Sequence, residues 1–314
     1  MKKLPTLNIL IVNWNAGNLL AECINTIQTT LKDSFILNEV VVVDNNSSDD
    51  SLNNTKTDSL PLRIIRNKTN VGFARACNQA ALDSNSDYIL MLNPDTKLFE
   101  DSLQKPLEFM EKSENRNIGI CGIKLIDENN NIARNCARFP SPLSMFIRSL
   151  GLDKIFPRIF KGHFMIEWDH NDSRIVDQVM GAFYLIRGEL FKSLNGYDER
   201  FFVYYEDLDF ALRAKKIGYN TYYLNDACVY HKGGGTSEQV KSTRLYYNLR
   251  SKILYANKHF GKLSFIFVAF GVFLFEPCSR LLYVLLKAEF NSVREIVEAY
   301  RMLIKYFFFR GKEN

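Results

Sequence analysis

Short apolar runs alternate with amphipathic segments through the first part of the chain. The runs have the length and the β-branched composition of buried strands, and they cover Asn8–Val12, Val40–Val43, Leu62–Arg66 and Tyr88–Leu92. Between them, residues 19–31 repeat apolar side chains at helical spacing, and residues 71–81 form a helical segment of small residues. Strands that alternate with helices at this rhythm predict an α/β domain with a doubly wound, mostly parallel sheet flanked by helices.

Further strands are predicted later in the chain, at Ile118–Ile126, Gln178–Arg187 and Thr221–Leu224. Residues 134–168 instead mix aromatic and basic side chains with three prolines. Proline removes a backbone donor and interrupts regular structure. We therefore expect residues 134–168 to form an irregular excursion over the site.

Polar side chains follow the apolar runs directly. Asp44 comes after Val43, Asn93-Pro94-Asp95 follows Leu92, and His231 precedes a glycine run. Each alone is typical of an ordinary turn or loop. In an open parallel sheet, however, ligands bind at the carboxyl ends of the strands, so a shared edge favours a functional site.

Three carboxylates, Glu206, Asp207 and Asp209, lie just after the aromatic run of residues 201–205. The apolar spacing from Leu208 predicts a helix whose first turn carries these acids, where the helix dipole favours negative charge. The pattern fits acid/base chemistry or metal binding, and it fits an ordinary charged helix start equally well.

The composition limits the classes of protein. With 46% hydrophobic and 24% charged residues the chain is expected to fold, and a net charge of +5 is too diffuse to indicate nucleic acid. The six cysteines contain no C-x-x-C pair and predict reduced thiols without a zinc site. The N-terminus shows no secretion signal, so we expect a cytosolic catalytic domain.

The glycine-rich phosphate motifs are missing from the sequence. Neither G-x-G-x-x-G after the first strand nor G-x-x-x-x-G-K-[ST] occurs. Their absence disfavours a dinucleotide-dependent oxidoreductase. The phosphate of a bound nucleotide is then most simply held by a metal.

Taken in order, the motifs closely resemble those of the inverting family 2 glycosyltransferases with a GT-A fold, above all the bacterial rhamnosyltransferases of surface polysaccharide assembly. The resemblance extends from about Leu7 to about Lys258, and the matching motifs are Val12–Asn15, Val43–Asp49, Asn70–Ala74, Leu92–Asp95, Gly181–Phe183, Glu206–Asp209 and His231. It implies a GT-A glycosyltransferase domain over residues 1–258 and a C-terminal helical extension over residues 259–314.

The resemblance assigns the site residues. Asp44 would hydrogen-bond the pyrimidine or ribose of a nucleotide-sugar donor, and the rest of the donor pocket would comprise Asn13, Asn15, Asn46, Asn70, Gly72, Phe73, Asn93 and Gly181. Asp95 and His231 would bind Mg²⁺ or Mn²⁺ on the diphosphate. Asn93 stands where the family has the first acid of its D-x-D element, which leaves one strong oxygen ligand.

The resemblance makes Asp207 the general base that removes the proton of the acceptor hydroxyl. Glu206 or Asp209 would orient Asp207 or contact the acceptor. The leading hypothesis is transfer of L-rhamnose from dTDP-L-rhamnose to a glycan or lipid-linked glycan. The alternatives are a UDP-sugar donor (galactofuranose, glucose or N-acetylglucosamine) and a non-catalytic nucleotide-sugar-binding scaffold. The oligomeric state, including a homo-oligomer, stays open.

The C-terminal part of the chain changes character. The apolar run Leu263–Phe275 is followed by Glu276-Pro277, where we expect a break, and then by Leu281–Leu286. The first run would form a helix about 20 Å long, short of the roughly 30 Å hydrocarbon core, which argues against a clean transmembrane span.

Residues 296–308 place apolar side chains on one helical face and basic side chains elsewhere. We expect membrane-surface attachment at the cytoplasmic face of a bacterial cell membrane, peripheral or monotopic. The alternative is a helical pair that packs on the core or on a second subunit.

Overall fold

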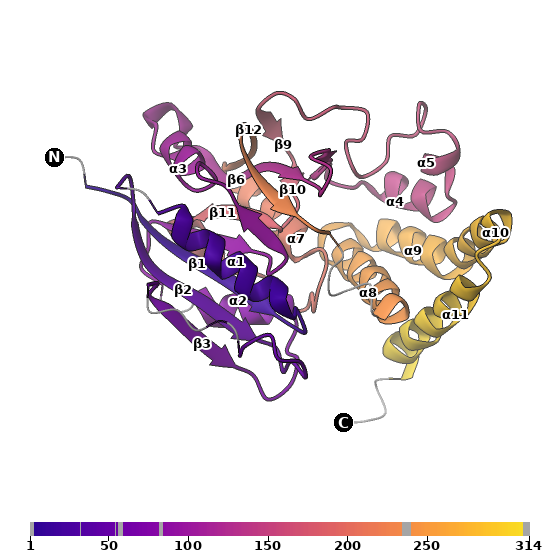
Figure 1. Ribbon diagram of the computed structural model, residues 1–314. Coiled ribbons are helices and arrows are strands. Elements are labelled where there is room, and N and C mark those ends of the chain that lie inside the picture. Colours follow the sequence, from indigo (N-terminus) through magenta and orange to yellow (C-terminus); the bar gives the residue numbers. More distant parts are fainter. Residues whose placement is uncertain are drawn as a thin grey trace. The chain divides into compact units, whose positions relative to one another are not determined.

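The computed structural model describes residues 3–31, 33–53, 55, 59–81, 84–233 and 240–309 (Figure 1). The chain forms two compact units. The sheet unit comprises Met1–Phe139, Phe164–Glu199 and Glu206–Thr236, and the helical unit comprises Pro140–His163, Arg200–Tyr205 and Ser237–Asn314. The predicted boundary between residues 258 and 259 stays a prediction, and residues 310–314 of the predicted extension lie outside the described residues.

The sheet unit begins with four parallel strands in the order β3-β2-β1-β4. They are β1 (Thr6–Asn13), β2 (Ile36–Asp44), β3 (Leu62–Arg66) and β4 (Tyr88–Leu92). All four were predicted, and β3 and β4 have the predicted bounds. The central residues of β1, β2 and β4 are fully buried, as expected of strands covered on both faces.

The second half of the sheet is mixed. It consists of β11 (Phe183–Arg187), β6 (Ile118–Ile126), β12 (Asn220–His231) and β5 (Thr96–Leu98), with β7 (Ile132–Ala133) and β9 (Arg174–Val176) at its margins. The strand β11 runs antiparallel to both of its neighbours, β4 and β6, whereas β12 is parallel to β6. The remaining pairs, β12 with β5 and β9 and β6 with β7, are also antiparallel.

The prediction of a mostly parallel sheet is therefore wrong. The chain reaches β11 from β6 through residues 127–182, and the helices of this stretch, α4 (Pro142–Ser149) and α5 (Leu152–Ile155), belong to the helical unit. They therefore do not supply the crossover helix on the sheet that a parallel connection needs. The predicted strand over residues 178–187 is also interrupted. Its first two residues form β10 (Gln178–Val179), which pairs with β8 (Cys136–Ala137) in a separate two-stranded ribbon.

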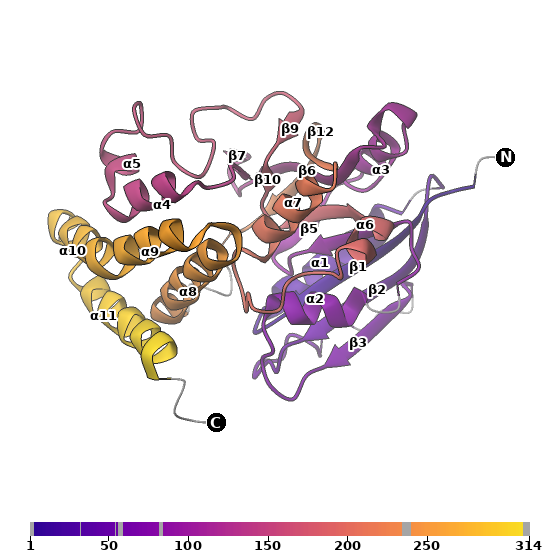
Figure 2. The same cartoon turned by 180° about the vertical axis from the view of Figure 1, so that it is seen from behind.

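Helices cover both faces of the sheet, which can be followed in Figures 1 and 2. One hydrophobic cluster joins α1 (Asn18–Thr29) and α3 (Gln104–Met110) to Ile9 and Ile11 of β1. The other joins α2 (Phe73–Ala81), α6 (Gly188–Ser193) and α7 (Glu206–Lys216) to Leu10 of the same strand. Successive side chains of a strand point to opposite faces, so this division confirms a sheet wound with helices on both sides.

The helical unit is built almost entirely from helices. They are α4 (Pro142–Ser149), α5 (Leu152–Ile155), α8 (Lys241–His259), α9 (Lys262–Phe270), α10 (Glu276–Lys287) and α11 (Asn291–Ile304), with π-helical turns η3 (Gly271–Phe275) and η4 (Lys305–Phe309).

The break expected at Glu276-Pro277 is wrong. The helices α9 and α10 continue through η3 as one helix of 26 residues, Lys262–Lys287. Pro277 lies in the first turn of α10, directly after the π-helical turn, where its missing N–H is tolerated. At about 1.5 Å per residue this helix is about 39 Å long. Within the described residues it is the one helix that is long and apolar enough to cross a membrane.

A buried polar cluster links the helices of this unit. Lys252 Nζ of α8 lies 2.9 Å from Glu276 Oε2, and Arg280 Nη2 lies 2.6 Å from Glu276 Oε1. Ser149 of α4 also donates to Glu276. Burial alone would raise the pKa of Glu276, but Lys252 and Arg280 outweigh it and lower this pKa to about 2. Burial lowers the pKa of Lys252 against the opposing pull of Glu276.

Candidate active site

The carboxyl ends of β1 and β2 hold the first group of predicted site residues. Asn13 and Asp44 are opposite each other in the parallel register, and both are buried. Asn13 Nδ2 donates to Asp44 Oδ1 at 2.8 Å, and the Ser47 amide donates to Asp44 Oδ2 at 3.2 Å. Asn13 Oδ1 is buried without a partner in the described part of the chain. This edge therefore presents a fixed carboxylate beside an unsatisfied acceptor.

Two asparagines shape the loops above these strands. Asn15 and Asn46 have φ angles of 50° and 62°, in the left-handed region that asparagine tolerates better than most residues. Asn15 Oδ1 accepts a hydrogen bond from the Ser48 amide at 2.7 Å, while the Asn15 amide donates to Ser47 Oγ. Asn15 thus ties the loop after β1 to the loop after β2.

The start of α2 lies beside this pair of loops. Gly72 has a φ of 89°, and its amide donates to Asn70 Oδ1 at 3.0 Å. Its carbonyl accepts from Asn45 Nδ2 at 3.2 Å, which brings Asn70, Gly72 and Phe73 next to the Asp44 loop. Asn45 and its partner Asn67, which donates to Asn45 Oδ1, were not predicted as site residues. The two consecutive asparagines after β2, Asn45 and Asn46, were the sequence feature that could have indicated this role.

The turn between β4 and β5 meets the end of β12. Because His231 is paired with Thr96 in the antiparallel register, its side chain reaches Asp95. His231 Nε2 lies 3.3 Å from Asp95 Oδ1 and 3.4 Å from Asn93 Nδ2. His231 is thus brought next to Asn93 and Asp95, which lie far from it in the sequence, as the motif pattern implied. The glycine run after His231 extends beyond the described residues.

These three side chains are a carboxylate, an imidazole and an amide. Asp95 and His231 are both largely buried, with side chains 9% and 10% exposed. Over the residues that the structure describes, no group of three or more His, Cys, Asp or Glu side chains could hold a metal ion. A metal at this turn would therefore need further ligands from the substrate or from water.

The start of α7 lies near the turn before β11. Asp207 is partly exposed, and its Oδ1 accepts from the Leu208 amide at 2.8 Å. A Cβ atom at Gly181 would lie 3.6 Å from Asp207 Oδ2, so the chain passes close beside this carboxylate. The adjoining Ala182 carbonyl accepts from the Asn93 amide at 3.0 Å. Asp207 and Asn93 therefore flank the same short segment.

Burial raises the pKa of Asp207, and hydrogen bonding from the Leu208 amide, the Gln178 side chain and the Gly181 amide opposes this rise. Gln178 was not predicted as a site residue. A polar residue inside an otherwise apolar strand segment was the signal, and here its side chain helps to keep the base candidate ionised.

The other two acids of the group differ from Asp207. Glu206 is buried, its Oε2 has no partner among the described residues, and burial together with the charge of Asp207 raises its pKa well above the usual value. Asp209 is fully buried and lies 2.7 Å from Arg213 Nε. Arg213 also donates to the Leu194 and Gly196 carbonyls, so this pair holds the loop before α7. Asp207 is the one acid of the three that is partly open to solvent.

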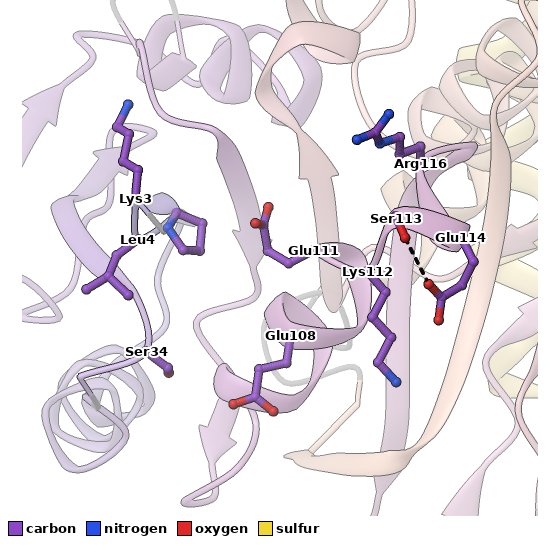
Figure 3. A pocket seen from close by; sticks show the side chains of 10 residues that line it. Lys3, Leu4, Ser34, Glu108, Glu111, Lys112, Ser113, Glu114 and Arg116 are labelled. Atoms are coloured by element: carbon purple, nitrogen blue, oxygen red, sulfur yellow. Dashed lines mark hydrogen bonds between the residues drawn. The ribbon is translucent and has the colours of Figure 1, made fainter. Parts of the chain in front are cut away.

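A cavity of about 620 Å³ lies elsewhere, at the start of β1 and the end of α3 (Figure 3). Its lining alternates in charge, with Lys3, Glu108 and Arg116 among the residues. Glu111 of this lining accepts a hydrogen bond from Tyr88 at the amino end of β4. None of the predicted site residues lines this cavity.

The chain is similar in sequence to known glycosyltransferases. The chain resembles rhamnosyltransferase WbbL of Escherichia coli (strain K12), with 28% identity over 193 residues that cover 59% of this chain and 69% of that protein. It also resembles the N-acetylglucosaminyl-diphospho-decaprenol L-rhamnosyltransferase of Mycobacterium tuberculosis, with 24% identity over 235 residues that cover 71% and 76% of the two chains.

Among solved structures, mannosyltransferase PcManGT from Pyrobaculum calidifontis, in complex with GDP-Man and Mn²⁺, has a TM-score of 0.57 at 14% identity. The match covers 98% of this chain and 89% of that one, and it shows a GT-A-like mixed α/β fold. The model of glycosyl transferase family 2 matches residues 8–170, just over half of the 314 residues. This chain therefore belongs to glycosyl transferase family 2.

Proposed function

We propose that the protein is an inverting glycosyltransferase that moves L-rhamnose from dTDP-L-rhamnose onto a lipid-linked glycan in surface polysaccharide assembly. The observation that supports the mechanism is the contact of His231 with Asp95, together with the position of Asp207 beside Gly181, whose neighbour Ala182 accepts from the Asn93 amide. The choice of rhamnose is supported by the names of two relatives, one of which acts on a diphospho-decaprenol-linked sugar by its name.

The donor nucleotide occupies the edge formed by β1, β2 and the start of α2. Asp44 accepts hydrogen bonds from the pyrimidine or the ribose, and Asn13 holds its carboxylate in place. The loops around it complete the pocket, with Asn15, Asn46, Asn70, Gly72, Phe73, Asn93 and Gly181. The unsatisfied Asn13 Oδ1 supports this assignment, because buried polar atoms are rarely left without a partner.

A divalent cation, Mg²⁺ or Mn²⁺, fits beside the diphosphate. Asp95 supplies a hard oxygen ligand and His231 an imidazole, with Asn93 next to them. This small number of protein ligands is appropriate for a cation that is also coordinated by phosphate oxygens and water. The imidazole shifts the metal preference toward Mn²⁺. When bound, such a cation stabilises the charge that develops on the departing nucleoside diphosphate.

Asp207 is the general base. Its carboxylate takes the proton of the acceptor hydroxyl as that oxygen attacks the anomeric carbon from the side opposite the nucleotide. The bond from carbon to the diphosphate oxygen breaks with inversion, and the nucleoside diphosphate leaves with the electron pair. Glu206, the preceding residue, orients Asp207. Burial and the charge of Asp207 raise the pKa of Glu206 well above its usual value, which favours keeping the negative charge on Asp207.

The helical unit attaches the enzyme to the cytoplasmic face of the membrane as a peripheral or monotopic protein. The helix from Lys262 to Lys287 exposes large apolar side chains, among them Leu263 at 84% and Leu286 at 77% exposure. Phe290 and Phe308 are more than 60% exposed in the same unit. So much apolar surface is unusual for a water-facing unit and supports the proposed attachment.

The test measures the release of dTDP from dTDP-L-rhamnose with Mn²⁺ and polyprenyl-diphosphate-linked N-acetylglucosamine. The wild type should release dTDP, and Asp207→Asn should bind the donor normally but lose about 10²- to 10⁴-fold in transfer. Normal turnover by this variant would remove Asp207 from the mechanism. Release of UDP from a UDP-sugar, without release of dTDP from dTDP-L-rhamnose, would show that the donor is a UDP-sugar. If no donor releases its nucleoside diphosphate, the non-catalytic binding scaffold is favoured.

A further inference from the structure

An apolar groove of about 750 Å³ lies along α10, α11 and the turn η4 of the helical unit. Its wall includes Pro277 and Leu281 from α10 and Ile296 and Val297 from α11. The volume falls within the range of about 300–1,000 Å³ that is usual for small-molecule sites. A long apolar concavity of this size can take a hydrocarbon chain.

Two cations, Arg301 and Lys305, line the same groove. They are four residues apart and therefore lie one helical turn from each other on the same face. Both are exposed, and neither forms an ion pair within the described part of the chain. No carboxylate is among the residues that line the groove. The groove thus combines an apolar wall with a positive charge that nothing described neutralises.

Exposed apolar side chains elsewhere on these helices indicate which medium surrounds the groove. Leu285 of α10 is 56% exposed, and Phe308 of η4 is 67% exposed. The helix α10 is the second half of the apolar helix from Lys262 to Lys287. Apolar surface of this kind is typical of a protein face that meets lipid.

We propose that the groove binds one anionic glycerophospholipid of the bilayer, with an acyl chain against Leu281, Ile296 and Val297 and the headgroup phosphate between Arg301 and Lys305. The occupant follows from the lining. An extended peptide would need hydrogen-bond partners along its backbone, whereas the apolar wall supplies none. A neutral lipid would leave two cations unmatched, while guanidinium and ammonium groups pair well with phosphate. This binding does not depend on the transfer reaction.

The test is native mass spectrometry of the full-length protein in mild detergent, after incubation with phosphatidylglycerol or with phosphatidylcholine of the same acyl chains. The wild type should retain one phosphatidylglycerol and much less phosphatidylcholine. Arg301→Gln/Lys305→Gln should weaken retention of phosphatidylglycerol by about 30-fold, because each cation near a phosphate surface contributes roughly fivefold. The control Lys287→Gln/Arg294→Gln removes the same charge outside the groove and should retain the lipid.

A second variant tests the apolar wall. Val297 is 56% exposed, so Val297→Trp should fill the groove without disturbing the core, and it should release phosphatidylglycerol at an unchanged unfolding temperature. Equal loss in the control double variant would show diffuse charge attraction and overturn the site. Equal retention of both lipids, or retention of farnesyl diphosphate in place of phosphatidylglycerol, would overturn the proposed occupant.

Discussion

Two isosteric substitutions separate the roles of Asp209 and Asp207. In Asp209→Asn the ion pair with Arg213 is lost from a fully buried position. Breaking a buried pair by removing one partner costs about 3–5 kcal/mol. Arg213 is 18% exposed and keeps its bonds to the Leu194 and Gly196 carbonyls, so we expect the lower end, about 3 kcal/mol. For a unit of this size the unfolding temperature should fall by about 6–12 °C.

The matched variant Asp207→Asn should behave in the opposite way. Burial raises the pKa of Asp207, which means that its charged form is disfavoured by its surroundings. Removing that charge should leave the unfolding temperature unchanged or slightly raised. Transfer should fall by about 10²- to 10⁴-fold, because the acceptor hydroxyl loses its base.

The assay combines thermal unfolding with nucleoside diphosphate release, measured well below the unfolding temperature of Asp209→Asn. At that temperature Asp209→Asn should stay within about tenfold of the wild-type rate, far from the loss expected of a missing base. The reasoning is refuted if Asp209→Asn unfolds at the wild-type temperature and yet loses transfer as fully as Asp207→Asn. Asp209 would then act in the chemistry rather than in holding the loop before α7.

Three further predictions concern the metal and the buried cluster of the helical unit. Asp95→Ala should raise the Mn²⁺ concentration needed for half-maximal release by a larger factor than His231→Ala, and an unchanged metal titration would contradict the assignment. Glu276→Gln should lower the free energy of unfolding in urea by about 3–5 kcal/mol, because it leaves the buried ammonium group of Lys252 without its carboxylate. Lys252→Met should lower it by less, because Arg280 still pairs with Glu276. Equal losses in the two variants would argue against this asymmetry. The folded pKa of Glu276 is about 2 against an ordinary value of 4.5, so its stabilisation is complete above pH 4.5 and is lost as the pH falls toward 2. Urea midpoints of the wild type and Glu276→Gln should therefore converge over that range, and parallel pH profiles would count against the linkage.

The strands that the sequence predicted best are those with continuous apolar runs. The bounds of β3 and β4 are as predicted, because turn formers delimit both runs. The orientation of β11 could not be read in the same way. A buried strand has the same apolar pattern whether its neighbours are parallel or antiparallel, so only the path of residues 127–182 decides it. The helices of this path, α4 and α5, belong to the helical unit, so the path supplies no crossover helix within the sheet unit.

The same limit applies to the acids of α7. The sequence placed Glu206, Asp207 and Asp209 together on one helical turn but could not rank their surroundings. Asp209 differs because Arg213 lies one turn further along the helix and draws it into a buried pair. The spacing of four residues was visible in the sequence, but burial of the pair depends on the loop that ends at Gly196. The break predicted at Pro277 was wrong for a related reason. A proline is compatible with a helix break and with a helix that continues after a π-helical turn, and only the packing around it decides between them.

The meeting of His231 with Asp95 depends on a feature that the sequence concealed. The predicted strand ended at Leu224, before the polar pair Asn225-Asp226, whereas β12 continues to His231. The register with β6 shifts between Leu224 and Cys228, where three residues of β12 have no counterpart on β6.

This irregularity is anchored from outside the strand. The Asn225 amide donates to Ser173 Oγ at 2.9 Å, and the Asn225 side chain donates to the Asn171 carbonyl at 2.8 Å. Because side chains alternate between the faces of a strand, an odd insertion exchanges the faces of every later residue. His231 therefore points toward Asp95 because of these three residues. The polar pair Asn225-Asp226, which suggested the end of a strand, instead belongs to the irregularity that orients the imidazole of His231 in the proposed metal site.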